Sequence, residues 1–545
     1  MIRHRGRTAL ALALALSLAL GPTLAGCTSA PQNGGTVRQL SVVPAPASVT
    51  AGESAAFPLD ARVRIEGDAD AAAALTALLE ARTGLELGAS ASEDDDTGVV
   101  RLDVDKSSGG AESYRLTADE ASVIVTGADA AGLFYGVQTL AQLVDRDGDR
   151  WVVPAVEIAD APRFAYRGVM LDVARHFHPV ETVKGYIDRA AGLKFNVLHL
   201  HLSDDQGWRI QLTSRPELTE RASATSVGGD AGGFYTKDDY REIVEYAASR
   251  HMTLVPEIDM PGHTHAVGLA YPELVEEPVI TDAVRATIEA FGGDLPAAGV
   301  PYEGIAVGFS SLRIHDEATY DFVADVFGEL AAMTPGPYLH FGGDEAHGTA
   351  DDDFAEFVER TSRLISDLDK IPVAWHEAGS APDLCDDTIG QYWGFVQPTE
   401  GMDDKARAFV KLGSQIILSP ADAVYLDMKY DKSTTLGLSW ANGPTSVQRA
   451  YSWEPSDVID GIEDDDILGV EAPLWTETVR SADDIDHLAF PRIAAAAEAA
   501  WSPATGASEL RTWESFRERV GALGPLWTSL GIAYHPSDEI PWTSE

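Results

Sequence analysis

The architecture of this 545-residue chain is indicated most directly by the run Pro337-Tyr338-Leu339-His340-Phe341-Gly342-Gly343-Asp344-Glu345. A short apolar segment is followed by two glycines, which tolerate unusual backbone angles, and then by two adjacent acids. A charged surface helix would place polar residues beside the acids, and this segment does not. The pattern therefore indicates a buried strand that ends at a pair of carboxylates. The competing interpretation is a helix N-terminus leading into Asp351-Asp352-Asp353.

Two carboxylates held next to each other have a chemical consequence. Each disfavours the ionisation of the other, so one can stay charged while its neighbour keeps a proton near neutral pH. Cleavage of a glycosidic bond requires this division of roles. Asp344 and Glu345 are therefore the candidate catalytic pair.

A regular alternation begins at Arg163 and predicts the fold class. Aliphatic or β-branched runs occupy residues 168–173, 195–202, 253–258, 338–341, 371–375, 388–393, 415–418 and 467–474. Segments with helical spacing lie between them, at 183–193, 237–250, 320–333, 354–368 and 403–412. Eight such runs are typical of an α/β fold, the (β/α)8 TIM barrel, whose parallel strands are buried on both faces. Residues 276–308 fit neither pattern and indicate an insertion after the third strand.

Polar and aromatic residues gather where these runs end. They are Asp172, Arg175, His201, Asp204, Glu257, Asp259, Asp344, Glu345, Trp375, His376, Glu377, Trp393, Tyr425, Asp427, Trp475 and Glu477. Active sites of barrel enzymes are built from the carboxyl ends of the strands. A barrel with a purely structural role would show no such bias, so the pattern favours an enzyme.

The chain is long enough for two domains, because single cores rarely exceed about 250–300 residues. Residues 37–160 mix expected strands (61–65, 114–117, 122–125) with helical spacing (72–81, 132–143), which predicts a small α+β domain. Residues 92–97 and 106–110 are its expected surface loops. We expect the barrel at 161–520 and a C-terminal tail at 521–545 that packs on it.

The composition excludes one class of partner. Lys and Arg total 40 against 86 Asp and Glu, which gives a net charge of −46 and a pI near 4.5. Such a surface repels phosphate backbones, so nucleic acid is not an expected partner. Acidic runs such as 93–96 and 463–466 are interpreted as solvated loops.

The N-terminus has the pattern of an export signal. Three arginines within residues 3–7 precede the apolar segment 8–20, which is too short to span a bilayer. Leu24-Ala25-Gly26-Cys27 resembles a bacterial lipobox, so Cys27 is the predicted site of lipid attachment and 28–36 a tether to the cell envelope. Ordinary cleavage that leaves an idle cysteine is the alternative. The second cysteine, Cys385, then has no disulfide partner.

Several long motifs together resemble glycoside hydrolase family 20, the β-N-acetylhexosaminidases. They are Asp160-Ala161-Pro162-Arg163-Phe164, Arg167-Gly168-Val169-Met170-Leu171-Asp172-Val173-Ala174-Arg175-His176-Phe177, His199-Leu200-His201-Leu202-Ser203-Asp204-Asp205-Gln206-Gly207-Trp208-Arg209, Glu257-Ile258-Asp259-Met260-Pro261-Gly262-His263-Thr264 and the Gly-Gly-Asp-Glu segment. The resemblance covers roughly residues 37–501, including the small first domain.

The resemblance implies hydrolysis of terminal N-acetylhexosamine from a non-reducing end, with retention and with the substrate supplying the nucleophile. The 2-acetamido oxygen attacks the anomeric carbon and forms an oxazolinium ion, so neither a protein nucleophile nor a cofactor is expected. Glu345 would be the general acid and then the general base. Asp344 would orient the acetamido N–H.

The same resemblance assigns the remaining site residues. Trp375, Trp393 and Trp475 would enclose the acetamido group, and Tyr425 would hold its oxygen. Arg175, Asp427 and Glu477 would bind sugar hydroxyls. Asp204, Asp259 and His263 would support the catalytic pair, either directly or through hydrogen bonds. The expected partners are oligosaccharides or glycoconjugates that end in N-acetylhexosamine.

Two departures and two rival functions stay open at this point. Phe341 and Ala374 replace frequent family residues, and the unaligned segment 276–308 leaves the preferred aglycone undetermined. A metal-dependent barrel hydrolase is one rival, because His199 and His201 share a strand face and His263 and His265 follow another strand. A lipid-anchored protein that binds amino sugars without turnover is the other.

Overall fold

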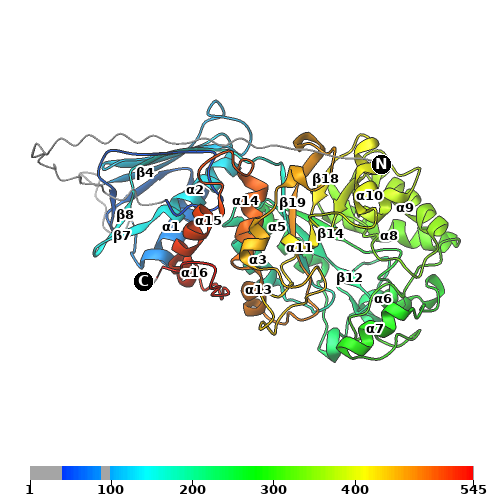
Figure 1. Ribbon diagram of the computed structural model, residues 1–545. Coiled ribbons are helices and arrows are strands. Elements are labelled where there is room, and N and C mark those ends of the chain that lie inside the picture. Colours follow the sequence, from blue (N-terminus) through cyan, green and yellow to red (C-terminus); the bar gives the residue numbers. More distant parts are fainter. Residues whose placement is uncertain (1–39, 88–97, 544–545) are drawn as a thin grey trace, which may run out of the picture. The chain divides into compact units, whose positions relative to one another are not determined.

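The computed structural model describes residues 40–87 and 98–543, and its central feature is a closed barrel of eight parallel strands (Figure 1). The strands are β10 (Tyr166–Asp172), β11 (Val197–His201), β14 (Thr253–Glu257), β15 (Tyr338–His340), β16 (Ile371–Trp375), β17 (Ile389–Tyr392), β18 (Ile416–Leu418) and β19 (Ile467–Leu474), with β19 pairing β10 to close the barrel. Each of the eight predicted runs overlaps one strand, so the predicted TIM barrel is confirmed.

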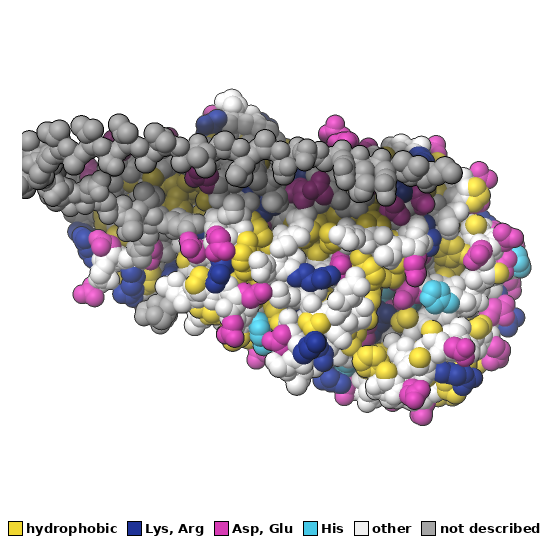
Figure 2. All heavy atoms as spheres, in the orientation of Figure 1, with side chains coloured by type: hydrophobic (Ala, Val, Ile, Leu, Met, Phe, Trp, Pro, Cys, Tyr) yellow, Lys and Arg dark blue, Asp and Glu magenta, His cyan; other side chains and the backbone are white. Residues whose placement is uncertain are grey.

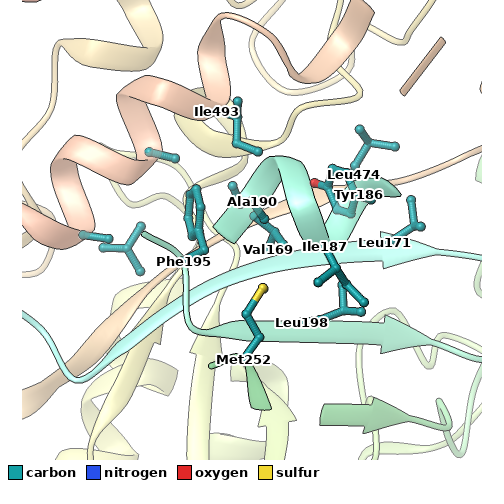
Figure 3. Close-up of a cluster of buried hydrophobic side chains, with 14 of the residues drawn as sticks. Val169, Leu171, Tyr186, Ile187, Ala190, Phe195, Leu198, Met252, Leu474 and Ile493 are labelled. Carbon is teal, nitrogen blue, oxygen red and sulfur yellow. The ribbon is translucent and has the colours of Figure 1, made fainter. Parts of the chain in front are cut away.

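Helices pack against the outside of the barrel. They include α3 (Val180–Ala191), α5 (Lys237–Ser249), α8 (Glu317–Met333), α9 (Asp351–Ser366), α10 (Met402–Lys411) and α14 (Arg492–Trp501). Figure 3 shows the packing at β10, where Val169 and Leu171 lie beside Ile187 and Ala190 of α3 and Ile493 of α14. Successive residues of a strand point to opposite faces, so the intervening residues of β10 face the barrel interior.

The barrel interior changes character from its amino end to its carboxyl end. An apolar cluster of Tyr166, Val197, Val255, Val373, Ile389 and Ile417 fills the amino end. Above it lies a buried polar group formed by His199, Glu257, His340, Gln391 and Glu471. A second cluster, with Met170, Trp375, Tyr425 and Trp475, lies at the carboxyl end. The aromatic layer is therefore at the end where barrel enzymes place their sites.

The small domain precedes the barrel and has a six-stranded sheet in the order β1-β9-β5-β6-β4-β3. Its strands are β1 (Ser48–Ala51), β3 (Arg64–Gly67), β4 (Val99–Val104), β5 (Tyr114–Ala118), β6 (Ser122–Gly127) and β9 (Val156–Asp160), with helices α1 (Ala69–Thr83) and α2 (Ala130–Leu143). The expected strands at 114–117 and 122–125 are β5 and β6. The strand expected at 61–65 begins only at Arg64, because residues 61–62 form a turn.

Buried contacts join the small domain to the barrel. Helix α2 is almost wholly buried, and the ring of its Tyr135 lies 5.2 Å from that of Trp501 in α14. At the same junction the Lys194 ammonium lies 3.0 Å from Asp160, and both side chains are fully buried. Leu40–Glu545 accordingly form one compact unit.

The segment 276–308 is more ordered than expected. It contains helix α7 (Asp282–Phe291), whose first turn is capped by the Thr281 side chain. The only buried residue of this helix is Val284, which packs in a small cluster with Tyr302 and Ala306 from the same segment and with Phe309 directly after it. The helix was missed because its apolar residues face their own loop rather than the barrel core.

Some expectations lie outside the described residues. They are the signal segment 1–27 with Cys27, the tether 28–36 and the acidic run 93–96. Among the helices that the structure describes, none has the length and apolar character needed to cross a membrane. Carboxylate side chains are scattered over the face of the molecule shown in Figure 2, as the net charge requires.

Candidate active site

The Gly-Gly-Asp-Glu segment forms a tight turn at the carboxyl end of β15. Gly342, Gly343 and Glu345 all have positive φ angles, of 73°, 97° and 43°. A Cβ atom on Gly342 would lie 1.7 Å from Asp259 Oδ1, and the amide of Gly343 donates to that same oxygen at 2.9 Å. Glycine is therefore required at 342, and the strained Glu345 backbone is typical of a functional turn. The helix-cap interpretation is wrong, because α9 begins at Asp351 with Ala350 as its N-cap residue.

The two acids of this turn differ in exposure and in proton affinity. Asp344 is buried, whereas 31% of the Glu345 side chain is exposed. Burial first, and the charge of Asp344 second, raise the pKa of Glu345 to about 7. Glu345 can therefore hold a proton near neutral pH beside an acid that is ready to accept a hydrogen bond.

His263 lies among four acids. Its Nε2 is 3.8 Å from Glu345 Oε2, 3.9 Å from Asp344 Oδ2 and 3.9 Å from Asp259 Oδ2, while its Nδ1 is 3.1 Å from Asp204 Oδ1. Burial alone would lower the pKa of His263, but the charges of Asp204, Asp259 and Asp344 raise it well above its usual value. Burial and the charge of the neighbouring Asp344 also raise the pKa of Asp259 well above its usual value.

Aromatic side chains form a cluster at the carboxyl end of the barrel, the end that also carries the acid pair. Trp375, Trp475 and Tyr425 belong to one buried cluster, in which the indoles of Trp375 and Trp475 have centroids 6.1 Å apart, and Trp393 packs against it. The Trp375 indole N–H donates to Glu257 at 2.9 Å, and the Trp393 indole N–H donates to Glu377 at 3.0 Å. Burial and the charge of Asp344 raise the pKa of Glu377 to about 8.

The polar residues predicted to bind sugar hydroxyls are buried near the same aromatic cluster. Arg175 Nη2 lies 2.7 Å from Asp204, and the guanidinium lies 4.8 Å from the centroid of the Trp475 ring. Both carboxylate oxygens of Asp427 and one of Glu477 are buried without a hydrogen-bond partner among the described residues. Burial, reinforced by the charge of Glu477, raises the pKa of Asp427 well above its usual value. Buried oxygens of this kind need donors from water or from a ligand.

The four histidines behind the metal-dependent alternative do not form one site. His199 lies 2.9 Å from both Glu257 and Glu471 inside the barrel. His265 donates to the Val300 carbonyl at 2.7 Å. Within the described part of the chain, three other groups of residues hold nitrogen or carboxylate oxygen atoms that could bind a metal ion and that lie within 4.8 Å of one another. They are His199, Glu257 and His340; Asp204, Asp205 and His263; and Asp259, His263 and Asp344.

One residue of this region was missed by the sequence analysis. Trp440 is 47% exposed, and its ring centroid lies 6.0 Å from that of Trp393 and 5.8 Å from that of Tyr425. It belongs to an irregular segment between α11 (Ala421–Val424) and α12 (Val447–Tyr451), away from any strand end. The sequence feature that could have indicated it is a single tryptophan in a loop with Gly, Ser and Asn, where no hydrophobic core is expected to bury the indole.

Comparisons with known proteins agree with this geometry. The family model for the glycosyl hydrolase family 20 catalytic domain matches residues 164–353 and 347–504, and that for domain 2 of the family matches 39–161. A β-N-acetylhexosaminidase of Cellulomonas fimi is 42% identical over 451 residues, which are 82% of this chain and 84% of the relative.

Solved structures give the same result. A glycoside hydrolase family 20 β-N-acetylglucosaminidase is 71% identical with a TM-score of 0.86, over 92% of this chain and 99% of the other. The Streptomyces plicatus N-acetyl-β-hexosaminidase in complex with Thio-NAglucal is 43% identical with a TM-score of 0.82, over 93% of this chain and 98% of the other.

Proposed function

Because the chain belongs to glycoside hydrolase family 20 and is a β-N-acetylhexosaminidase, we propose that it removes single N-acetylglucosamine or N-acetylgalactosamine residues from non-reducing ends by substrate-assisted, retaining catalysis. The observation that carries the proposal is the aromatic enclosure of Trp375, Trp475 and Tyr425 beside an acid pair of which one member can hold a proton near pH 7. An acetamido group fits such an enclosure, and a protonated acid fits a leaving oxygen.

In the first step, the acetamido carbonyl oxygen attacks the anomeric carbon while Glu345 donates its proton to the glycosidic oxygen. The C–O bond to the aglycone breaks, and an oxazolinium ion forms on the sugar. Asp344 accepts a hydrogen bond from the acetamido N–H and stabilises the positive charge that develops there. The tryptophans hold the acetamido group close to the anomeric carbon, which removes an entropic barrier.

In the second step, the ionised Glu345 takes a proton from water, and the water oxygen opens the oxazolinium ion from the face that the aglycone has left. Two inversions give a product with retained configuration. Arg175, Asp427 and Glu477 hold the sugar hydroxyls throughout, which provides the partners that the buried oxygens of the two acids require.

The stereochemistry of the first product tests the mechanism. Proton NMR of a chitotriose digest at early times is expected to show the β-anomer of N-acetylglucosamine and chitobiose, with the single sugar released from the non-reducing end. An α-anomer, or a covalent glycosyl-enzyme detected on a carboxylate by mass spectrometry, would contradict substrate assistance. Activity that is lost with a chelator and restored by a divalent cation would instead favour a metal-dependent hydrolase, and binding without turnover would favour the sugar-binding alternative.

We also propose export of the protein and lipid attachment at Cys27, on the order of basic, apolar and lipobox segments at the N-terminus. A Cys27→Ser variant expressed in its native host is expected to leave the membrane fraction and lose labelling by a fatty-acid probe. Equal membrane association of the wild type and the variant would rule out the anchor.

A further inference from the structure

Glu257, the last residue of β14, contacts four nitrogen atoms from three other strands. Its Oε1 accepts the Trp375 indole N–H at 2.9 Å and lies 3.1 Å from His340 Nδ1. Its Oε2 lies 2.5 Å from His201 Nδ1 and 2.9 Å from His199 Nε2. The side chain is fully buried, and its hydrogen bonds are to the Trp375 indole N–H and to His201 Nδ1, whereas His340 Nδ1 itself accepts the amide of Gly342 at 3.0 Å.

Two of these contacts lead to different parts of the active site. The indole of Trp375 is part of the enclosure proposed for the acetamido group. On the other side, His201 Nε2 lies 2.9 Å from Asp204 Oδ2, and Asp204 Oδ1 lies 3.1 Å from His263 Nδ1. His263 is the imidazole beside Glu345. One buried carboxylate therefore contacts Trp375, which belongs to the proposed acetamido enclosure, and begins a chain of contacts that ends beside Glu345.

We propose that Glu257 is a positioning residue that holds the Trp375 indole and, through His201 and Asp204, the His263 imidazole in fixed positions relative to each other. It thereby aligns the attacking acetamido oxygen with the proton of Glu345. This inference rests on the proposed substrate-assisted mechanism. It assigns to Glu257 no contact with the substrate.

The electrostatics of the group make this arrangement rigid. A buried carboxylate is tolerated only when it is paired and hydrogen-bonded. Although burial opposes it, the charge of His201, reinforced by the other two imidazoles, holds the pKa of Glu257 well below its usual range. Burial likewise opposes protonation of His201, but the charge of Glu257 raises its pKa to about 9. His201 also lies 2.9 Å from Asp204 and Glu257 lies 2.9 Å from His199, so these buried charges hold one another through several contacts, and a shift of one weakens the pairing of its neighbours.

Glu471 of β19 provides a matched control inside the same barrel. It is also fully buried, and it contacts His199 Nδ1 at 2.9 Å, Tyr166 OH at 2.5 Å and Gln391 Nε2 at 2.7 Å. Its hydrogen-bond partners among the described residues include neither Trp375 nor His201. Replacement of Glu471 by Gln removes an equally buried charge from the same polar layer. It leaves in place the contacts of Glu257 with Trp375 and with His201.

The first experiment compares Glu257→Gln with Glu471→Gln on 4-nitrophenyl N-acetyl-β-glucosaminide and on its N-propionyl analogue. Glu257→Gln is expected to lose about 100-fold in kcat, the effect of a misplacement near 1 Å, with KM changed less than threefold. Its preference for N-acetyl over N-propionyl substrate is expected to fall about fivefold or more, because a loosened indole admits the extra methylene.

Glu471→Gln is expected to keep kcat within threefold and the preference unchanged. Equal kcat losses in both variants, or an unchanged preference in Glu257→Gln, would overturn the inference.

A second variant removes the same hydrogen bond from its other end and covers the case in which Glu257→Gln does not fold. Trp375→Phe keeps an aromatic wall but lacks the indole N–H. It is expected to lower the N-acetyl preference as Glu257→Gln does, and an unchanged preference would overturn the inference. Where both variants fold, the double variant is expected to lose at least tenfold less kcat than the product of the single losses. Early β-anomer release by the wild type tests the mechanism itself, so a failure of the alignment is distinguishable from a failure of the proposed function.

Discussion

Burial and the charge of Asp344 allow Glu345 to act as a proton donor, and they also raise the free energy of its ionised form. Replacing it by Gln removes the proton donor and keeps the shape, so we expect kcat for N-acetyl-β-glucosaminides to fall about 10²- to 10⁴-fold. KM should change little, because the sugar contacts remain. The loss should be smaller with a dinitrophenyl leaving group, which needs no proton. A kcat near that of the wild type on chitobiose would contradict the role of Glu345 as general acid.

The same variant makes a prediction about stability. The pKa of Glu345 is raised from 4.5 to about 7 in the folded protein, so the wild type loses stability as pH rises from 4.5 through 7. Gln has no such dependence. The Tm of Glu345→Gln relative to wild type is therefore expected to increase between pH 5 and pH 8, as measured by calorimetry. A constant Tm difference across this range would mean that the carboxyl titrates normally.

The pH dependence of activity reports on the pair rather than on one acid. In the wild type kcat/KM should fall as pH rises through about 7, where Glu345 loses its proton. Asp344→Asn removes a negative neighbour, so the pKa of Glu345 should fall and the alkaline limb should move to lower pH. Its kcat should also fall severely, because the acetamido group is no longer oriented. Profiles of kcat/KM against pH for both proteins measure the position of the alkaline limb. A limb at the same pH in the wild type and the variant would contradict the effect of Asp344 on the pKa of Glu345.

At the scale of elements, the turn after β15 shows why two glycines precede the acids. In Gly342→Ala, the new Cβ would overlap Asp259 Oδ1 and the residue would keep a positive φ of 73°. In Gly343→Ala, the nearest atoms are 3.9 Å away, so only the strain of its φ of 97° is added. We expect Gly342→Ala to lose both kcat and stability, and Gly343→Ala to lose about 1–2 kcal/mol of stability with activity largely kept. Urea unfolding and initial rates separate the two, and equal losses would contradict the role of the close approach to Asp259.

The elements that the sequence predicted correctly are those in which the apolar residues of the local sequence are also the residues buried in the structure. All eight barrel strands overlap short runs that are mainly aliphatic or β-branched, and the tryptophans at strand ends lie where their positions indicated. Helix α7 and Trp440 were not predictable in this way, because their packing depends on loop residues. The contact between His199 and Glu471 joins residues 272 positions apart, and no local pattern carries that information.

At the scale of the whole molecule, the polar layer inside the barrel and the buried ion pair at the domain junction serve different purposes. The first includes Glu257, whose contacts with Trp375 and His201 we interpret as alignment of the active site. The second joins Asp160 at the end of β9 to Lys194 before β11, and Asp160 also accepts the Trp501 indole N–H from α14. Because this pair links both domains, it should contribute to a single cooperative unfolding transition.

The junction pair gives the last prediction. Lys194→Met leaves the Asp160 carboxylate buried without its cation, which is expected to cost about 3–5 kcal/mol of unfolding free energy. Activity at low temperature should be kept, since Lys194 contacts none of the proposed site residues.

Lys184→Met is the matched control, because its partners Glu181 and Glu242 are largely exposed, and it should change stability little. Asp160→Asn added to Lys194→Met should restore part of the loss by removing the unpaired charge. Urea unfolding measures all three variants, and a similar small effect in Lys194→Met and Lys184→Met would show that the junction does not depend on the buried pair.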